Sequence, residues 1–362
     1  MAETALTLAS RVQKWDSDFF AEYVRDNRFR PYMGRDTMMP IVVKYELTSG
    51  GKQINIPIIA RLNGNGVQDN ARLAGNEEAL GNFNHPITVR WNRNAVSLPK
   101  SEEHWTEMNL RSATRSVLKT WAAESLRDDV VTALLSFTGA SYLASSAATY
   151  YAGVAEATKD TWLVNNADRV LFGAAKSNGS SNDHSTALAT IDNTADKMTT
   201  GLASLAKELA KEADPHIRPF RVEEMPGREF FVMFTQSRAF RDLKADSVMQ
   251  QANRDARPRE VGSNPIFQDG DLIYDGIIFR EIPDIPVISN GTIDVAPNFL
   301  VGAQAVGLAW GQEPKSTSKK EDDYGFFTGL GIEECRGASK IFRDETKQHG
   351  MVTVYTAGVA SA

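Results

Sequence analysis

The feature that most constrains the fold is a long connection between two segments that alternate like β-strands. In KQINIPIIARL and in PITVRWNR every second side chain is apolar, which is typical of half-buried strands. Pro57 lacks an amide hydrogen, so the first segment should be an edge strand. A hairpin needs about two to five connecting residues, and much longer loops inside a domain are usually functional. The stretch LNGNGVQDNARLAGNEEAL, Leu62 to Leu80, is therefore the first candidate for a functional segment.

Glycines this dense could hold a phosphate, or they could let the chain extend onto a neighbour. A phosphate-binding Walker loop ends in Gly-Lys-Ser/Thr, but here the third glycine is followed by Asn76, Glu77 and Glu78. Two carboxylates would repel a phosphate. A dinucleotide fingerprint needs a helix directly after its glycines, and more turn-forming residues follow them here. The stretch is better explained as an extended loop whose backbone groups need water or a neighbour.

No catalytic or metal-binding pattern stands out elsewhere. The five histidines are scattered, Cys335 is the one cysteine, and no G-x-S-x-G elbow occurs. Asp275-Gly276 in DLIYDGIIFREI predicts a type I′ hairpin rather than a calcium loop. We therefore expect no catalytic, cofactor or metal site.

Composition agrees with a folded protein that does not read nucleic acid. The 362 residues are 42% hydrophobic and 24% charged, and the net charge is -6. A dedicated nucleic-acid reader would usually carry a basic face, although a protein that encloses DNA need not. The chain has no apolar run long enough for a membrane span, and its first residues lack the features of a signal peptide. We expect folding in the cytoplasm and no membrane partner.

The segments before and after the loop predict an arm and a strut. A capping box, Ser10-x-x-Gln13, predicts a short N-terminal helix in an arm with too few apolar residues for its own core. After Pro99, with Ser101 as N-cap, no proline or glycine occurs until Gly139. This predicts one helix of about 35 residues, on the order of 50 Å long. Its predicted packing stripe includes Val117, Trp121, Leu126 and Val130.

The remainder predicts an α+β protein. Residues 139–190 are rich in Ala, Ser, Asn and Gly, and AAKSNGSSNDHS predicts a flexible loop in an insertion of uncertain role. An amphipathic helix through Ala195–Leu209 should stop before Asp214-Pro215, and Ser237 should cap a later helix. EFFVMF, FFTGLGIEE and MVTVYTA predict strands, and KSTSKKEDD predicts a polar loop. An arm, a long loop, a strut and no active site favour a protein that assembles with copies of itself.

Five blocks in a fixed order carry a resemblance to a known family: RLAGNEEAL, YDGIIFREIPDIP, FLVGAQAVGLAWG, DDYGFFTGLGIEECRGASKIF and GMVTVYTA. Together they resemble the major capsid proteins of tailed phages of the phage N-four type. The resemblance runs from about Arg28 to Ala357 and implies the Hong Kong 97-type capsid fold, with an arm, an extended loop (E-loop), a peripheral domain with a spine helix, and an axial domain. It implies this division: arm 1–48, E-loop 49–99, spine helix 100–138, insertion 139–190, axial domain 191–312 and peripheral return strands 313–362.

The resemblance also implies function and partners. The chain would form hexamers and pentamers of itself in an icosahedral shell around double-stranded DNA, assembled in the host cytoplasm. It would touch the packaged DNA weakly and could meet scaffolding, portal or decoration proteins. The alternatives are an encapsulin-like compartment shell of the same fold and, from another class, a small-molecule enzyme.

The loop tip offers a specific hypothesis for contact between subunits. Arg72, Asn76, Glu77 and Glu78 lie at the tip, and acids there would need basic partners if the tip docks on a neighbour. The candidate partners in the arm are Arg25, Arg28 and Arg30.

Overall fold

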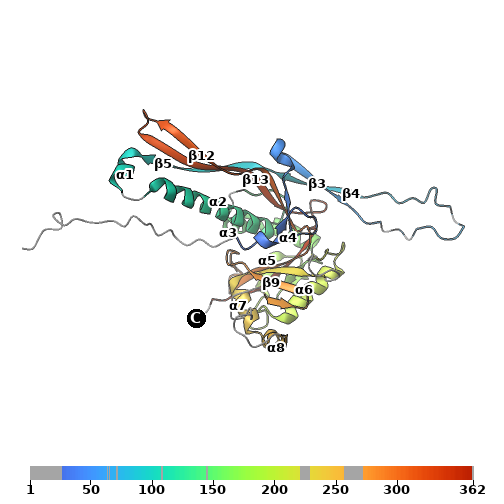
Figure 1. Cartoon of the computed structure of the whole chain (residues 1–362). Coiled ribbons are helices and arrows are strands. Elements are labelled where there is room, and N and C mark those ends of the chain that lie inside the picture. Colours follow the sequence, from blue (N-terminus) through green and yellow to red (C-terminus); the bar gives the residue numbers. More distant parts are fainter. Residues whose placement is uncertain are drawn as a thin grey trace, which may run out of the picture. The chain divides into compact units, whose positions relative to one another are not determined.

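The structure, a computed structural model of the chain, describes residues 27–62, 64, 66–70, 72–106, 109–143, 146–220, 229–256 and 272–360. The predicted N-terminal helix and Arg25 lie outside these residues. The described chain divides into two compact units (Figure 1). The smaller unit contains Trp91–Glu124 and Pro314–Glu334; the larger contains Asn27–Arg90, Ser125–Glu313 and the residues from Cys335 onward.

A seven-stranded mixed sheet forms the centre of the larger unit, in the order β6-β14-β11-β7-β9-β8, with β10 paired to β11. Strand β11 is antiparallel to both β14 and β7, whereas β6 is parallel to β14 and β9 is parallel to β7. The strand bounds are β6 Val170–Phe172, β7 Phe231–Thr235, β8 Leu272–Tyr274, β9 Ile277–Glu281, β10 Ile288–Ser289, β11 Asp294–Val301 and β14 Met351–Ala357.

Both faces of this sheet are covered by helices. Successive residues of β7 point to opposite faces, so Val232 and Phe234 belong to one apolar core and Phe231 and Met233 to the other. Helices α6 and α7 supply the second core, and α3, α4, α5 and the C-terminal part of α2 supply the first. The helix bounds here are α3 Ala147–Gly153, α4 Glu156–Asn165, α5 His184–Ala189, α6 Thr200–Glu212, α7 Ser237–Ala245 and α8 Ser247–Ala256.

Local signals set several of these boundaries. Asp275 and Gly276 have positive φ of 49° and 69° between β8 and β9, which confirms the type I′ hairpin. The amphipathic helix also exists as α6, although it begins only after its N-cap Thr199. The predicted N-cap Ser237 is wrong by one residue, because the Gln236 side chain accepts the hydrogen bond from the amide of Arg238.

The stretch that predicts a flexible loop is largely exposed, but it contains short helical turns. Residues 174–185 contain a short 3-10 helix, Lys176–Gly179, and the start of α5. Strand β6 precedes them and pairs with β14. The wider 139–190 segment does reach the first core of the larger unit, through large residues outside this stretch such as Trp162 and Phe172.

A second sheet has the order β1-β2-β12-β13-β5, and β12 and β13 contribute residues to both units. KSTSKKEDD is not a loop: Lys315–Asp322 belong to β12. The expectation is wrong because a strand with no neighbour on one edge can carry many polar side chains. The bounds are β1 Met33–Gly34, β2 Ile41–Lys44, β5 Arg90–Pro99, β12 Val306–Asp322 and β13 Phe327–Lys340.

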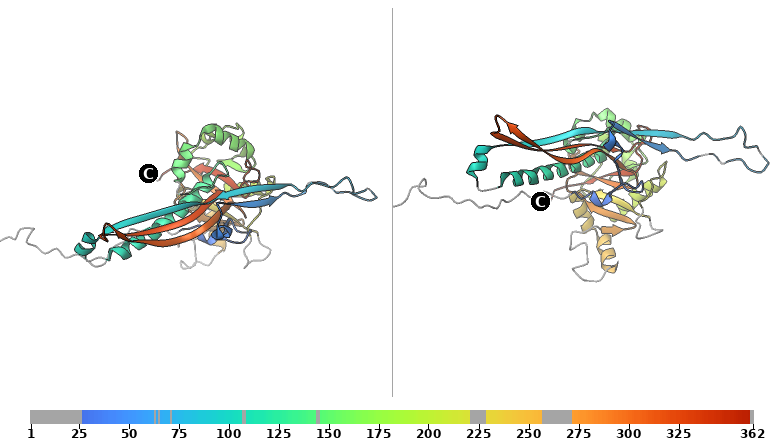
Figure 2. Two further views of the ribbon diagram at one scale, coloured as in Figure 1. Left: turned by 90° about the horizontal axis from the view of Figure 1, so that it is seen from above. Right: turned by 45° about the horizontal axis from the view of Figure 1, so that its top comes forward.

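The predicted single long helix is two helices. Helix α1 spans Lys100–Trp105, and Thr106 is extended with φ of -112° and ψ of 141°, so the helix ends there. Helix α2 spans Leu110–Leu135, and its 26 residues correspond to about 39 Å. Figure 2 shows α2 running alongside the strands of the smaller unit. Ser101 is not the N-cap, since α1 already begins at Lys100. No described helix has the length and hydrophobicity needed to cross a membrane.

The predicted packing stripe of α2 is partly wrong. Val117 is 58% exposed, whereas Leu118 beside it is 4% exposed. Trp121 is half-buried against the apolar cluster of the smaller unit, and Leu126 and Val130 pack in the first core of the larger unit. The stripe fails at Val117 because the buried face passes through Thr114 and Ala122, which do not stand out as apolar in the sequence.

This geometry predicts that truncating two adjacent residues of α2 changes the free energy of unfolding by very different amounts. Leu118→Ala should lower the free energy of unfolding by about 2–4 kcal/mol through a cavity among Leu98, Leu330 and Ile332. Val117→Ala should change it by less than about 0.5 kcal/mol. Urea unfolding of the unassembled subunit measures both. Equal losses in the two variants would show that the helix phase is wrong.

Candidate assembly surfaces

Strands β3, Gln53–Ile59, and β4, Asn82–Thr88, form a separate two-stranded sheet in the larger unit (Figure 1). Their register runs from Gln53 opposite Thr88 to Ile59 opposite Asn82, and the amide of Ala60 donates to Gly81 at 2.9 Å. Between Ala60 and Gly81 the described residues contain no strand. The two strands and their long connection are thus confirmed, and Pro57 lies on an edge strand as expected.

The hairpin root packs against the strands of the larger unit. Ile54 and Ile56 contact a small core with Ile87 of β4 and Ala309 of β12. The approach is so close that a Cβ at Gly307 would lie 2.4 Å from Ile87 Cδ1. Any larger residue at this point of β12 would displace the buried Ile87 side chain.

His85 of β4 secures the root through buried polar contacts. Its Nε2 lies 3.0 Å from Ser339 Oγ, and the amide of Phe342 donates to its Nδ1 at 3.4 Å. Burial, together with the charge of nearby His349, lowers the pKa of His85 to about 4. The imidazole is consequently neutral at physiological pH, and Nδ1 can accept the amide hydrogen of Phe342.

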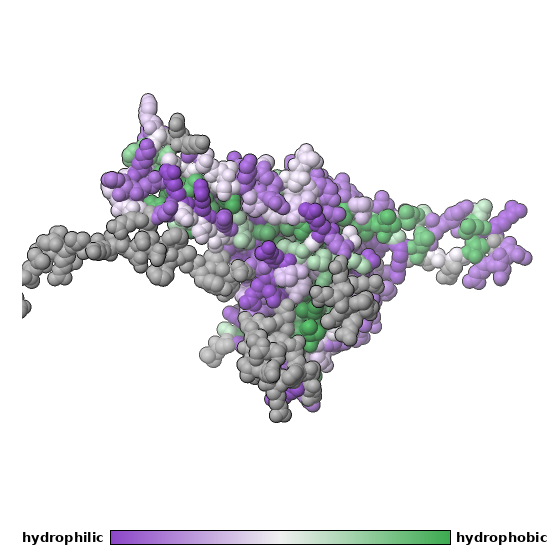
Figure 3. Space-filling view, viewed as in Figure 1, coloured by the Kyte–Doolittle hydropathy of each residue, from purple (hydrophilic) through white to green (hydrophobic). Residues whose placement is uncertain are grey.

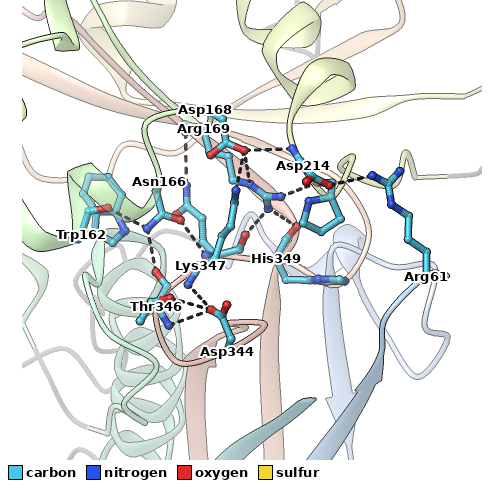
Figure 4. A network of polar contacts seen from close by, with 12 residues as sticks. Arg61, Trp162, Asn166, Asp168, Arg169, Asp214, Asp344, Thr346, Lys347 and His349 are labelled. Carbon is cyan, nitrogen blue, oxygen red and sulfur yellow. Dashed lines mark hydrogen bonds and ion pairs between the residues drawn. The ribbon is translucent and has the colours of Figure 1, made fainter. Parts of the chain in front are cut away.

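A polar network joins the end of β3 to the body of the larger unit (Figure 4). Arg61 Nη2 lies 3.0 Å from Asp214 Oδ1, and the amide of Asp214 donates to Asp168 Oδ2 at 3.1 Å. Asp168 also pairs with Lys347 Nζ at 3.0 Å. The Arg61 pair is exposed and contributes at most about 1 kcal/mol, so it orients the hairpin more than it stabilises the fold.

Arg169 occupies the centre of this network and is fully buried. Its guanidinium donates to the carbonyl oxygens of Gln348, His349 and Pro215. Burial lowers the pKa of Arg169, and burial followed by the charge of Arg169 lowers the pKa of His349 to about 4. One buried cation thus binds three carbonyl oxygens from two backbone segments and disfavours a second cation beside it.

The predicted tip residues gather in local turns. Glu77 Oε2 accepts from the amide of Gly75, and Glu78 Oε2 accepts from the amide of Gly64, both at 2.7 Å. Asn76 Nδ2 donates to the carbonyl of Arg72 at 2.9 Å. The structure therefore brings Arg72, Asn76, Glu77 and Glu78 together on an exposed segment.

Within one subunit, the arm contact seen among the described arginines is with β9 and not with these acids. Arg28 Nη1 lies 3.3 Å from Glu281 Oε2 and also donates to the Glu281 carbonyl, which fixes the arm to β9. Arg30 is exposed. A contact between the tip and the arm therefore concerns a neighbouring copy and stays a prediction.

Exposed apolar side chains are the feature that sequence reasoning missed. On the connection, Leu62, Leu73 and Leu80 are 59%, 63% and 63% exposed, and Figure 3 shows apolar and polar residues interspersed along the hairpin. Leucines within a glycine- and asparagine-rich loop were the available signal. The smaller unit exposes a further set: Trp91, Trp105, Val117, Tyr324 and Phe326. Such surfaces mark contacts with other proteins more often than solvent-facing loops.

The described residues include one acidic cluster, in which Glu156, Asp160 and Asp183 place oxygens within 4.8 Å of one another. Each has a structural partner. Glu156 pairs with Lys159 and lies 3.4 Å from His184 Nδ1, Asp160 accepts from the amide of His184, and Asp183 caps α5. Ion pairing and helix capping account for this cluster.

The comparisons with known proteins identify the family. The family described as "Phage capsid protein" matches residues 3–360 of this chain. The major capsid protein of Pseudomonas phage KPP25 is 26% identical over 374 residues, which cover 95% of this chain and 94% of that protein. The chain belongs to the phage capsid protein family.

Solved structures agree with this assignment. The capsid protein in the cyanophage Pam1 capsid asymmetric unit is 33% identical, with a TM-score of 0.87 and 100% of both chains covered. The matching chain in the capsid of Ralstonia phage GP4 is 20% identical, with a TM-score of 0.72 and 100% of both chains covered. At this identity the similarity shows the fold alone. The chain is a structural major capsid protein of tailed phages with an α+β, Hong Kong 97-type fold, not an enzyme, and it assembles into oligomeric shells of the virion. The phage N-four type is not distinguished from other types.

The buried histidines at the hairpin root predict sensitivity to acid. The pKa of His85 and of His349 falls from 6.5 to about 4 on folding, so the unfolded chain takes up protons first as pH decreases. Stability should be fully present above pH 6.5 and should be lost toward pH 4, by roughly 3 kcal/mol per histidine. Urea unfolding of the subunit across this pH range measures the loss.

Two variants test the cause of that loss. His349→Gln should flatten the pH dependence, whereas replacing exposed His104 by Gln should leave it unchanged. An unchanged pH dependence in His349→Gln would contradict the assignment.

Proposed function

We propose that the chain closes into an icosahedral shell of hexamers and pentamers around double-stranded DNA, and that the β3–β4 hairpin is an E-loop lying on a neighbouring subunit. In this proposal residues 1–48 form the arm, 49–99 the E-loop, 100–138 the spine region and 191–312 the axial domain. Residues 313–362 return to the peripheral domain. The role of 139–190 stays open, although β6 makes it part of the central sheet.

The observation that carries the bridging role is the exposure of Leu62, Leu73 and Leu80 on a connection without a core of its own. The cost of exposing three leucines would be removed if they were buried at an interface, which contributes about 1.5–3 kcal/mol for each fully buried side chain. A closed shell repeats every contact by symmetry, so small contributions accumulate.

Electrostatic pairing is the second part of the bridging proposal. Glu77 and Glu78 would face basic residues of a neighbour, with Arg30 the exposed candidate among the described arm residues. Arg72 and Asn76 shape the same turn. Arg25 stays a candidate from the sequence, and Arg28 could take part only by sharing its contact with Glu281.

Further partners belong to the same proposal. The net charge of -6 favours weak contact with packaged DNA, because tight binding of the genome would hinder packaging. Assembly in the host cytoplasm, with scaffolding, portal or decoration proteins, is proposed from the family resemblance.

Shortening the loop tests the bridging role. Ala60 and Gly81 form a hydrogen-bonded pair, so a two-residue Asn-Gly turn can replace Arg61–Leu80 without changing the β3–β4 register. The subunit should fold and melt normally but should fail to form stable shells in electron microscopy. A matched control is the full-length variant Leu73→Ser with Leu80→Ser, which should weaken assembly less. Intact shells from the shortened chain would exclude bridging.

Charge reversal tests the pairing. Glu77→Lys with Glu78→Lys should leave the subunit folded and should reduce assembly at low salt, because like charges would meet across a partly desolvated contact. Adding Arg30→Glu should restore part of the assembly, as judged by sizing chromatography. Normal shells from the lysine variant would rule out a charge-paired tip.

A further inference from the structure

A small notch lies between α2 and β12 in the smaller unit. It has a volume of about 100 Å³ and is open to solvent. Its basic groups come from α2, its hydroxyl groups from β12 and its apolar floor from α2 and β13. The lining side chains that matter are Arg115, Leu118, Lys119, Ser316, Ser318 and Leu330.

The notch exists because β12 does not continue the apolar core of its sheet. Leu330 and Ile332 of β13 contact Leu118 of α2. Successive residues of a strand point to opposite faces, so Gly331 belongs to the face of β13 that points away from the helix. A Cβ at Gly331 would lie 2.8 Å from Thr317 Oγ1, which places Thr317 on that far side too. By alternation Ser316 and Ser318 of β12 point toward α2, where the neighbouring strand has Leu330 and Ile332. Short hydroxyl side chains leave a hollow there.

Two cations border this hollow. Arg115 and Lys119 are four residues apart on α2, so they lie on the same helix face about 6 Å apart along the axis. Both are exposed, and neither makes an ion pair with any residue in the described part of the chain. Arg111, one turn earlier, is different because its Nε lies 2.8 Å from Glu103 Oε1. The charge at the notch is therefore available to a ligand.

These groups fit an anion with several oxygen acceptors. A guanidinium offers paired N–H donors, an ammonium offers a point charge, and two hydroxyl groups add donors that rotate. The open side of the notch leaves room for the rest of a polymer.

We propose that this notch binds a phosphate of the DNA backbone and is the place where a shell subunit contacts the packaged genome. This inference rests on the proposed enclosure of double-stranded DNA. The site reads no base sequence, since it holds only donors for phosphate oxygens. Because the whole chain carries a net charge of -6, two cations per subunit give a contact with DNA that is local and weak.

The test measures DNA binding of the full chain as a function of salt. A short labelled DNA duplex of mixed sequence is titrated with wild-type protein and with the Arg115→Gln, Lys119→Gln double variant over a range of NaCl concentrations. Each lost phosphate contact reduces the slope of log affinity against log salt by about 0.9, so the double variant, which loses the one phosphate held by the notch, should lose about 0.9. Inorganic phosphate should compete with the duplex for the wild type.

A matched control separates the notch from overall charge. Lys176→Gln with Lys197→Gln removes the same charge from exposed positions of the larger unit and should leave the slope unchanged. Ser316→Asp places a carboxylate in the notch and should weaken DNA binding at low salt. Equal slopes for the double variant and the control would overturn the proposal. The proposal would also be overturned if the double variant lost binding to poly-glutamate but kept its binding to DNA. That result would assign the notch to an acidic protein.

Shell formation is scored separately by electron microscopy. Closed shells from the double variant together with a reduced slope support the notch as a DNA contact. If wild-type protein forms no shells, the proposed enclosure fails whatever the slope, whereas normal shells with an unchanged slope refute the notch alone.

Discussion

The pairing of β11 with β14 is the constraint on which the larger unit depends. Seven residues of each strand face one another, and β14 is buried along its whole length. A ladder buried on both faces needs an apolar layer above it and another below it, because bare sheet faces would leave large apolar surfaces in water. Helices α6 and α7 supply one layer. The 139–190 segment supplies part of the other, which explains why a stretch of low hydrophobicity is folded into the core.

The same packing fixes where the long hairpin begins. Its root enters a narrow space in which Gly307 admits Ile87, and His85 and Arg169 satisfy buried polar groups. Hydrogen bonds between buried groups are strengthened by the low local dielectric, and they restrict the root to arrangements that keep them. The tip, by contrast, has only short-range turns and exposed leucines. A fixed root with an unsatisfied tip suits a segment whose final position is set by another subunit of the shell.

The smaller unit has two kinds of exposed surface. Its exposed aromatic residues suit contact with other proteins, whereas the notch at Arg115 and Lys119 suits an anion. Both follow from a thin three-stranded layer with α2 on one side only. A unit this thin cannot bury all of its apolar residues, so several of them remain exposed.

Sequence by itself determined the features that depend on neighbouring residues. The alternation in β3 and β4, the Asp275-Gly276 turn, the strand β14 and the α+β class follow from local periodicity and turn chemistry, and the family was recognisable from ordered blocks. Tertiary structure decided which side of α2 is buried: Leu118 packs and Val117 does not, because the facing strands, and not the helix, place the apolar floor. It also decided that KSTSKKEDD pairs as a strand, since backbone hydrogen bonds to β13 override side-chain polarity. The notch and the buried cation could not be read from the sequence, because each depends on residues that only the fold brings together.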